Sequence, residues 1–363
     1  MSERPIEPNG DALGTHRALD ASGARPAVRL LPQQAARVDN DFTRLFQGEM
    51  LIATETLNLD AASFSQMEEA ARSEDPATDV DAAVAHIVLR TVATRGKQHN
   101  QVTGSGGMLL GRVLQVAPGR DGDPLVPGDR VATLVSLALT PLRIDAVREV
   151  RRASAQMDVE GEAVVFASGA VAKLPVDIPE RVALAALDVA GAAPQVSRLV
   201  RPGHVVVVLG AGGKSGVLCV AAARQMGGPS ACVVGVESSP RGADDLRSLR
   251  LCTAVVAADA RDAVAVRRAV LDATGGREAD VTISCVNVPD VEMSAILVTR
   301  DRGVVYFFAM STSFTKAALG AEGVSKDVDL FIGNGYARGH AEDTLDLLRK
   351  SPELMALFTR RYG

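Results

Sequence analysis

Residues 205–216 read VVVVLGAGGKSG, and this stretch decides the fold. Its apolar start is typical of a parallel strand buried on both faces, and the helix-forming run VLCVAAARQM follows directly. A strand, a glycine turn and a helix in this order begin a βαβ unit, in which the helix N-terminus attracts a phosphate. The sequence therefore predicts a nucleotide-binding site at this turn.

The spacing of the glycines differs from the dinucleotide fingerprint G-x-G-x-x-G. Ser215 occupies the third glycine position, and Gly216 follows it. A P-loop is rejected, because it needs a glycine where Val208 stands inside the strand. The motif is thus a variant dinucleotide turn. Its expected pyrophosphate contacts are Gly210, Gly212, Gly213, Lys214, Ser215 and Gly216.

A second apolar run, residues 231–236, ends at Glu237. A carboxylate about 20 residues after such a turn binds a ribose hydroxyl of NAD and repels the 2′-phosphate of NADP. Arg241 keeps NADP open as an alternative. Asn287 follows another apolar run and is expected on the nicotinamide side. NAD is the expected cofactor.

Composition excludes several function classes. The chain of 363 residues has a net charge of −5 and no tryptophan, so a nucleic-acid surface is not expected. No apolar run reaches membrane-spanning length and the N-terminus is polar, so we expect a cytoplasmic protein that does not contact a membrane. Residues 1–25 are expected to be a loose or extended lead-in.

Apolar and helical segments alternate through the second half of the chain. Strands are expected at 205–209, 231–236, 254–257, 280–286, 303–309 and 328–332, with helices between them. Residues 179–200 are expected to form one helix before the first strand, and 340–350 and 352–361 the last two helices. This rhythm predicts a doubly wound α/β sheet.

The phrase LVPGDRVA at 125–132 resembles a strand of the medium-chain dehydrogenases. The resemblance implies an N-terminal barrel-like (GroES-like) substrate domain over residues 1–180 and a C-terminal Rossmann domain over 181–363. Zinc-dependent members take catalytic cysteines from the first half, but all four cysteines here lie after residue 218. No metal is therefore expected.

Longer segments resemble a narrower family. RGKQHNQVTGSGGMLLG at 95–111, NLDAASFSQ at 58–66 and MSTSFTKAALGAEGVSKDV at 310–328 are similar to the L-erythro-3,5-diaminohexanoate dehydrogenases of lysine fermentation. Gln101 departs from the proline expected there. The resemblance implies NAD-dependent oxidative deamination of a small diamino acid, with release of ammonium and NADH. A homodimer is also expected, because edge strands of such Rossmann domains often pair.

The implied reaction needs a base, a proton donor and groups that bind amines and a carboxylate. Candidates come from the resembling segments, and each has a structural alternative. Asp60 is expected to bind an ammonium or act as base, or else to cap a helix. Lys97 and His99 are expected to bind the carboxylate, act as base or relay protons, or else to lie in a solvated loop. Lys316 and Glu322 are expected at the substrate, or else on a solvated helix face.

Two other functions remain open from the sequence. A zinc-free NAD(P)H-dependent quinone or enone reductase would share the fold. A dinucleotide-sensing protein without catalysis would share the cofactor site. An assay with the diamino acid and an enone separates all three.

Overall fold

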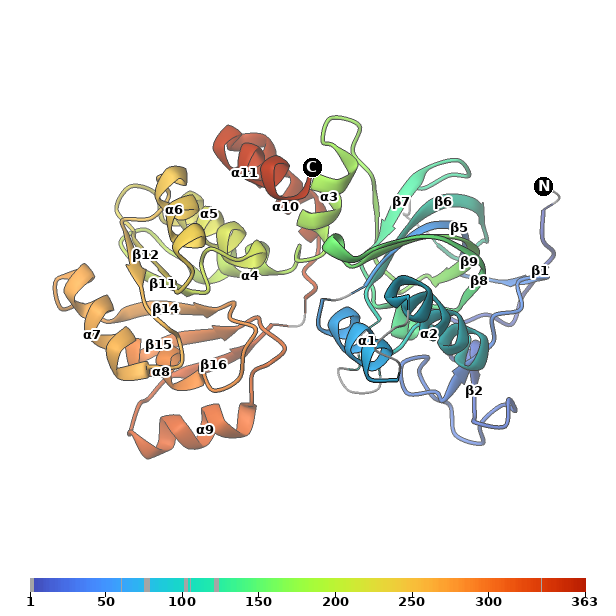
Figure 1. The fold of residues 1–363 in the computed structure, drawn as a ribbon, viewed down its shortest axis with the longest axis horizontal. Helices are drawn as coiled ribbons and strands as arrows, with labels where there is room; N and C mark the ends of the chain where they lie inside the picture. Colours follow the sequence, from blue (N-terminus) through green and yellow to red (C-terminus); the bar gives the residue numbers. More distant parts are fainter. Residues whose placement is uncertain are drawn as a thin grey trace. The chain divides into compact units, whose positions relative to one another are not determined.

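The computed structural model describes residues 3–59, 61–74, 79–100, 104, 106–120, 124–333 and 335–363. The chain divides into two compact units, Met1–Val176 (unit 1) and Asp177–Gly363 (unit 2), each with its own hydrophobic core (Figure 1). The division lies close to the expected boundary after residue 180. Among the described residues, no helix combines the length and apolar character that crossing a membrane requires.

Unit 2 is built on a six-stranded sheet in which neighbouring strands run parallel. The strand order is β13-β12-β11-β14-β15-β16, which is the order of a Rossmann fold with its reversal between β11 and β14. The expected doubly wound sheet is confirmed. Its strands are β11 (Val205–Leu209), β12 (Cys232–Glu237), β13 (Ala254–Ala257), β14 (Ala279–Ser284), β15 (Thr299–Phe307) and β16 (Asp329–Ile332).

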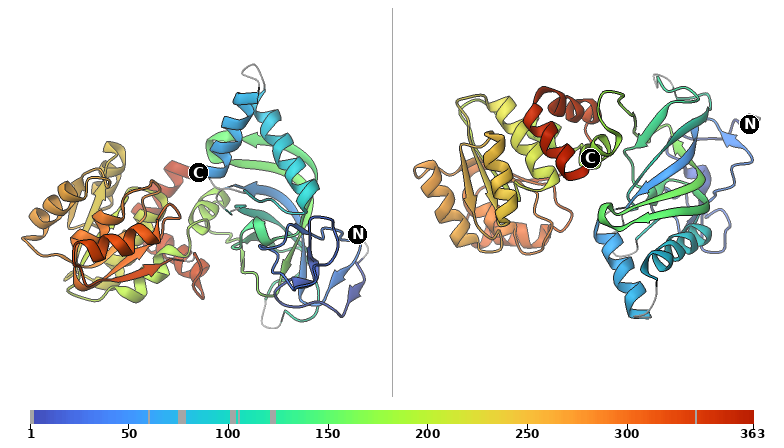
Figure 2. Two further views of the ribbon diagram at one scale, coloured as in Figure 1. Left: turned by 90° about the horizontal axis from the view of Figure 1, so that it is seen from below. Right: turned by 45° about the horizontal axis from the view of Figure 1, so that its top comes forward.

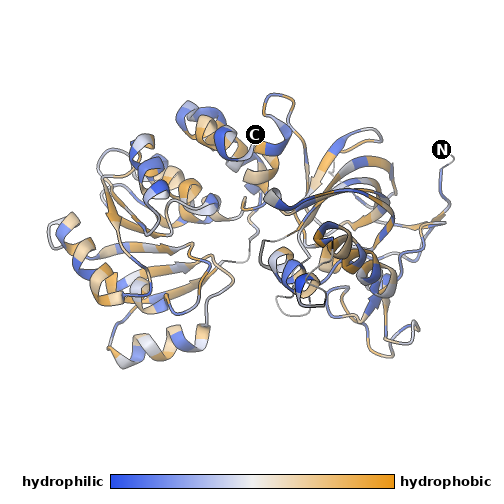
Figure 3. Cartoon of the chain, in the orientation of Figure 1, coloured by the Kyte–Doolittle hydropathy of each residue, from blue (hydrophilic) through white to orange (hydrophobic). Residues whose placement is uncertain are grey.

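Helices cover both faces of this sheet. Helices α5 and α6 pack on one face and α7 and α8 on the other (Figure 1). Every residue of β11 is buried, and the strands appear mostly in hydrophobic colours in Figure 3. The helices are α3 (Glu180–Leu187), α4 (Ala192–Leu199), α5 (Lys214–Gly227), α6 (Pro240–Leu249), α7 (Ala263–Thr274), α8 (Glu292–Val298), α9 (Phe314–Gly323), α10 (His340–Lys350) and α11 (Pro352–Tyr362).

The expectation of one helix over 179–200 is wrong, because the chain forms α3 and α4 with a break between them. Pro194 lacks the N–H that would bond to the carbonyl of Ala190, and its ring would clash with that carbonyl in a continuous helix. The Ala190 carbonyl instead accepts the Thr344 hydroxyl of α10 at 3.0 Å. Proline therefore stops the helix, and a distant threonine satisfies the carbonyl.

Unit 1 contains a six-stranded antiparallel sheet of order β10-β7-β6-β5-β9-β8. Its members are β5 (Glu49–Asn58), β6 (Met108–Val116), β7 (Arg130–Thr133), β8 (Leu142–Arg151), β9 (Gln156–Phe166) and β10 (Val171–Lys173). Two short pairs flank it: β1 (Ile6–Glu7) with β4 (Leu45–Phe46), and β2 (Ala18–Leu19) with β3 (Arg37–Val38). This separate sheet domain agrees with the expected fold class.

Two helices accompany the sheet of unit 1, and they are drawn in blue to teal in Figure 2. These are α1 (Ala61–Glu74) and α2 (Val80–Arg95), and α2 packs on β8. Asp79 caps α2 by accepting the N–H groups of Asp81 and Ala82, and Gly96 ends it in a left-handed conformation.

Of the two alternatives for the lead-in over residues 1–25, the extended one agrees with strands β1 and β2, whereas the loose one is wrong, because Arg17 is fully buried in unit 1. Its Nε and Nη2 donate to the two carboxylate oxygens of buried Glu49 at 2.6 and 2.8 Å. His16 Nε2 lies 2.8 Å from the same carboxylate, and the N–H of Phe46 donates to it at 2.9 Å. A charge that is buried needs a partner, so these contacts hold the segment against the sheet.

Candidate functional site

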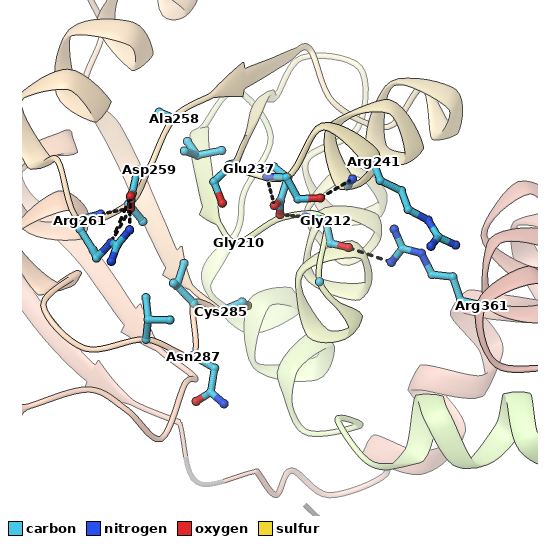
Figure 4. Close-up of a pocket in the computed structure, with 18 of the residues that line it drawn as sticks. Gly210, Gly212, Glu237, Arg241, Ala258, Asp259, Arg261, Cys285, Asn287 and Arg361 are labelled. Atoms are coloured by element: carbon cyan, nitrogen blue, oxygen red, sulfur yellow. Dashed lines mark hydrogen bonds and ion pairs between the residues drawn. The ribbon is translucent and has the colours of Figure 1, made fainter. Parts of the chain in front are cut away.

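A pocket of about 710 Å³ opens in unit 2 at the carboxyl ends of β11, β12, β13 and β14 (Figure 4). Segments that follow these four strands line it, together with the end of α11. In doubly wound sheets the strand order reverses beside the ligand crevice, and here the reversal falls between β11 and β14. The pocket therefore lies where this fold places a dinucleotide.

The geometry of the glycine turn shows why its third glycine stands one position later than in the common fingerprint. Gly210 ends β11 with a φ of 70°, a conformation that favours glycine. A Cβ on Gly216 would lie 2.2 Å from the carbonyl oxygen of Gly210, so this residue gives the close helix–strand approach. Gly216 therefore performs the role of the third fingerprint glycine, one position later than the common spacing.

Glu237 is the last residue of β12, and its carboxylate links the glycine turn after β11 to the loop after β12. Its Oε2 accepts the N–H of Gly212 at 2.9 Å, and its Oε1 accepts the N–H of Ser239 at 2.8 Å. Each carboxylate oxygen has a second lone pair, so it can still accept a hydrogen bond from a hydroxyl group of a ligand in the pocket. Arg241 is exposed and also lines the pocket.

The expected cofactor contacts fall into two groups. Gly210, Gly212, Gly213, Glu237 and Asn287 line the pocket, whereas Lys214, Ser215 and Gly216 form the first turn of α5. Lys214 pairs with Asp188 at the end of α3, with 2.7 Å between Nζ and Oδ2. The Lys214 ammonium also lies 5.6 Å from the centroid of the Tyr362 ring.

In unit 1, Lys97 and His99 lie just after α2. Lys97 is 1% exposed, and its Nζ donates to the carbonyls of Pro32 and Ala35 at 2.6 and 2.9 Å. Burial, with a smaller contribution from Arg95, lowers the Lys97 pKa to about 8. Burial and the neighbouring cations also lower the pKa of His99.

The other expected catalytic residues are placed differently. Asp60 lies outside the described residues. Lys316 and Glu322 lie exposed on α9 in unit 2, and Lys316 forms an ion pair with Asp290 that raises its pKa. Within the described part of unit 2, the pocket lining consists of other segments. The catalytic roles of all five residues stay predictions.

Sequence reasoning missed several residues that line the pocket. Asp259 and Arg261, which form an ion pair, follow β13, and the rule that located Glu237 at a strand end also applies to Asp259. Arg361 and Tyr362 come from the last turn of α11. No sequence signal marks them, because only the packing of α11 brings them to the pocket.

Among the described residues, no group of three or more His, Cys, Asp or Glu side chains gathers in a metal-binding arrangement. The four cysteines are free thiols, and the Cys219 and Cys285 sulfur atoms lie 3.7 Å apart.

Comparison with known proteins places this geometry in context. Residues 23–175 match the L-erythro-3,5-diaminohexanoate dehydrogenase N-terminal domain. L-erythro-3,5-diaminohexanoate dehydrogenases from Acetoanaerobium sticklandii and Fusobacterium nucleatum are each 45% identical to the chain, over 97% of its length and 99% of theirs. An alcohol dehydrogenase structure from Thermotoga maritima shares the fold, with 16% identity, a TM-score of 0.54 and coverage of 85% of this chain and 84% of its own.

The reductase alternative is not favoured by these comparisons. A likeness at 16% identity shows the fold alone, and this fold serves many chemistries. The relatives at 45% identity are dehydrogenases named for the diamino acid.

Proposed function

Because the chain belongs to the L-erythro-3,5-diaminohexanoate dehydrogenase family, we propose that it catalyses the NAD-dependent oxidative deamination of this diamino acid. The substrate, NAD and water would give 5-amino-3-oxohexanoate, ammonium, NADH and a proton. The supporting observation is the 45% identity along nearly the whole chain. Measuring NADH formation from NAD and the diamino acid tests the proposal. The proposal would be overturned if no amine substrate gave NADH but the protein reduced an enone.

Unit 2 is the proposed NAD-binding domain, and unit 1 the proposed substrate domain. When bound, NAD supplies the acceptor for the hydride that leaves C3 of the substrate. The residues of the glycine turn would hold the pyrophosphate, with the N-terminus of α5 favouring its charge. Glu237 would accept hydrogen bonds from the hydroxyl groups of the adenosine ribose. Each of these groups is already positioned by contacts within unit 2.

The preference for NAD over NADP is expected to depend on Glu237. Glu237→Gln keeps the shape and one acceptor for Gly212 but removes the negative charge that repels a 2′-phosphate. We expect the ratio of kcat/KM for NAD to that for NADP to fall about 10- to 100-fold, the value of a hydrogen bond to a charged group. Steady-state kinetics with both cofactors measure it. An unchanged ratio would mean that Glu237 does not determine the preference for NAD, and Arg241 would be the next residue to replace.

Chemistry at C3 requires removal of a proton from the substrate ammonium, after which loss of hydride from C3 and of a second proton from nitrogen would leave an imine that water attacks. We propose Lys97 as the base, because it lies in the segment 95–111 that resembles the family and because burial lowers its pKa to about 8, so that it can lose a proton close to neutral pH. To act, its Nζ would have to leave the carbonyls of Pro32 and Ala35. Its buried position also fits a second role, in which it holds the segment around Pro32 and Ala35. The two roles predict different pH behaviour.

A base with a pKa near 8 must be deprotonated to act, so kcat/KM is expected to fall as pH drops below about 8. Lys97→Met is expected to lower kcat/KM about 100-fold and to remove this pH-dependent limb. The matched control is Lys173→Met, because Lys173 is an exposed lysine of β10 that pairs with Asp129. A Lys97→Met enzyme that melts earlier but keeps the wild-type pH profile would leave Lys97 a structural role only.

A homodimer is proposed through the edge of the parallel sheet. β16 is the last strand of the sheet, and Phe331 and Ile332 on it are 48% and 56% exposed. An edge strand leaves backbone groups open to a second strand, and apolar side chains on it favour pairing. Light scattering is expected to give a dimer for the wild type and a monomer for Phe331→Lys. A monomeric wild type contradicts this. The cytoplasmic location stays a prediction.

A further inference from the structure

The last turn of α11 makes a direct contact with the glycine turn. Arg361 Nη1 donates to the carbonyl of Gly212 at 2.8 Å (Figure 4). The N–H of the same glycine donates to Glu237. Both polar groups of Gly212 are therefore held by side chains, one from β12 and one from α11.

The Arg361 side chain is itself firmly held. Its Nε and Nη2 donate to Oδ2 of Asp245 in α6, at 3.0 and 2.5 Å, and the side chain is 13% exposed. All three guanidinium nitrogens thus have acceptors within the protein. Arg361 is consequently suited to fix the position of the turn.

The helix that carries Arg361 is anchored independently. Phe358 is fully buried, and its ring lies 5.4 Å from that of Tyr362. Tyr362 lines the pocket, and its ring also lies near the Lys214 ammonium. The end of α11 therefore meets both the glycine turn and the start of α5, which are the two parts of the proposed pyrophosphate site.

We infer that Arg361 is a positioning residue for the dinucleotide site. It supports the site by linking the Gly212 carbonyl of the glycine turn to Asp245 of α6. This inference rests on the proposed NAD-binding function of unit 2. It adds the C-terminal helix to the site, a part that strand-end reasoning alone does not reach.

The adjacent residue provides a matched control. Arg360 Nη2 donates to Oδ1 of the same Asp245 at 2.5 Å, but its side chain is 55% exposed and it lies outside the pocket lining described for unit 2. Arg360→Ala and Arg361→Ala each remove one arginine from Asp245. Only the second removes the bond to Gly212.

The test measures NADH affinity by the fluorescence of bound NADH, together with KM for NAD, KM for the diamino acid and melting temperature. Arg361→Ala is expected to raise the Kd of NADH and the KM of NAD about tenfold, with the KM of the diamino acid unchanged. Arg360→Ala is expected to stay within about twofold of the wild-type Kd. Arg361→Lys keeps the charge beside Asp245 but lacks the planar fork that spans two acceptors, so it is expected to lie between the wild type and Arg361→Ala.

A wild-type Kd in Arg361→Ala overturns the inference, as does an equal loss in Arg360→Ala, because either result removes the Gly212 contact as the cause. If Arg361→Ala does not fold, Arg361→Lys decides the matter by the same two constants. A wild-type protein that fails to bind NADH overturns the proposed function instead, so the two failures are distinguishable.

Discussion

Gly212→Val is expected to weaken NADH binding about 100-fold or more and to lower NAD-dependent activity with it. A Cβ on Gly212 would lie 2.8 Å from Glu237 Oε2 and 2.8 Å from the Cα of Gly242, so valine must displace the turn, Glu237 or α6. A shift of about 1 Å at a positioned group costs roughly 100-fold, and valine adds bulk in the proposed path of the pyrophosphate. NADH fluorescence titration measures the loss.

The control for this variant is Gly323→Ala at the end of α9, where an added Cβ meets no atom within 4 Å among the described residues. It is expected to bind NADH like the wild type. Circular dichroism of both variants shows whether the fold persists. A folded Gly212→Val protein with wild-type affinity would mean that the dinucleotide does not approach this turn.

Glu49→Ala is expected to cost unit 1 about 3–5 kcal/mol of unfolding free energy, because it removes the carboxylate that accepts Nε and Nη2 of the buried Arg17 and leaves the more distant Asp39, with Oδ2 3.8 Å from Nη1. Arg17 and Glu49 are both fully buried, so water cannot replace the lost partner. Urea denaturation followed by circular dichroism measures the change. The control is Glu160→Ala, which removes an exposed ion pair with Arg148 and is expected to cost less than about 1 kcal/mol.

The double variant Arg17→Met with Glu49→Leu is expected to be more stable than Glu49→Ala, because neither member of the pair is left as an uncompensated buried charge. Burial alone would raise the pKa of Glu49, but Arg17 and His16 hold it below the ordinary 4.5. The stabilisation is thus present above pH 4.5 and is lost as the pH falls through the lower folded pKa. A Glu49→Ala protein as stable as the wild type at neutral pH would contradict this account.

The parts of the fold that were predicted have local sequence signals. β11 is a continuous apolar run that ends at Gly210, and Glu237 ends the next such run, so both could be located from the chain alone. The break before α4 also had a local signal, since Pro194 is tolerated in the first turn of a helix but not in its interior, and the expectation of one helix overlooked it.

The hairpin of β8 and β9 was not predicted, for a physical reason. The pairing of β8 with β9 shifts register between Ile144 and Ala146 and again between Val147 and Glu149. Each irregularity breaks the alternation of apolar and polar residues on which strand prediction depends. Many charged residues on the exposed face weaken the signal further.

Contacts between distant segments could not be predicted at all. Arg17 meets Glu49, and Arg361 meets Gly212, only after the intervening chain has folded. The candidate site shows the same limit, because strand ends located Glu237 and Asn287, whereas the contact of the predicted helix α11 with the pocket was missed. Lys97 illustrates another limit, since its burial and lowered pKa depend on packing that a loop sequence does not reveal.

The buried Arg17–Glu49 pair also determines where unit 1 can be cut from the chain. The family match begins at residue 23, which suggests a natural starting point for an isolated domain. A fragment that starts there would keep Glu49 but lose Arg17, His16 and strand β1, the partner of β4. The sheet of this fragment would lack the Arg17 cation that pairs with the buried Glu49 carboxylate. A fragment that keeps these contacts has to include Ile6, at the start of β1, so its boundary differs from the boundary of sequence similarity.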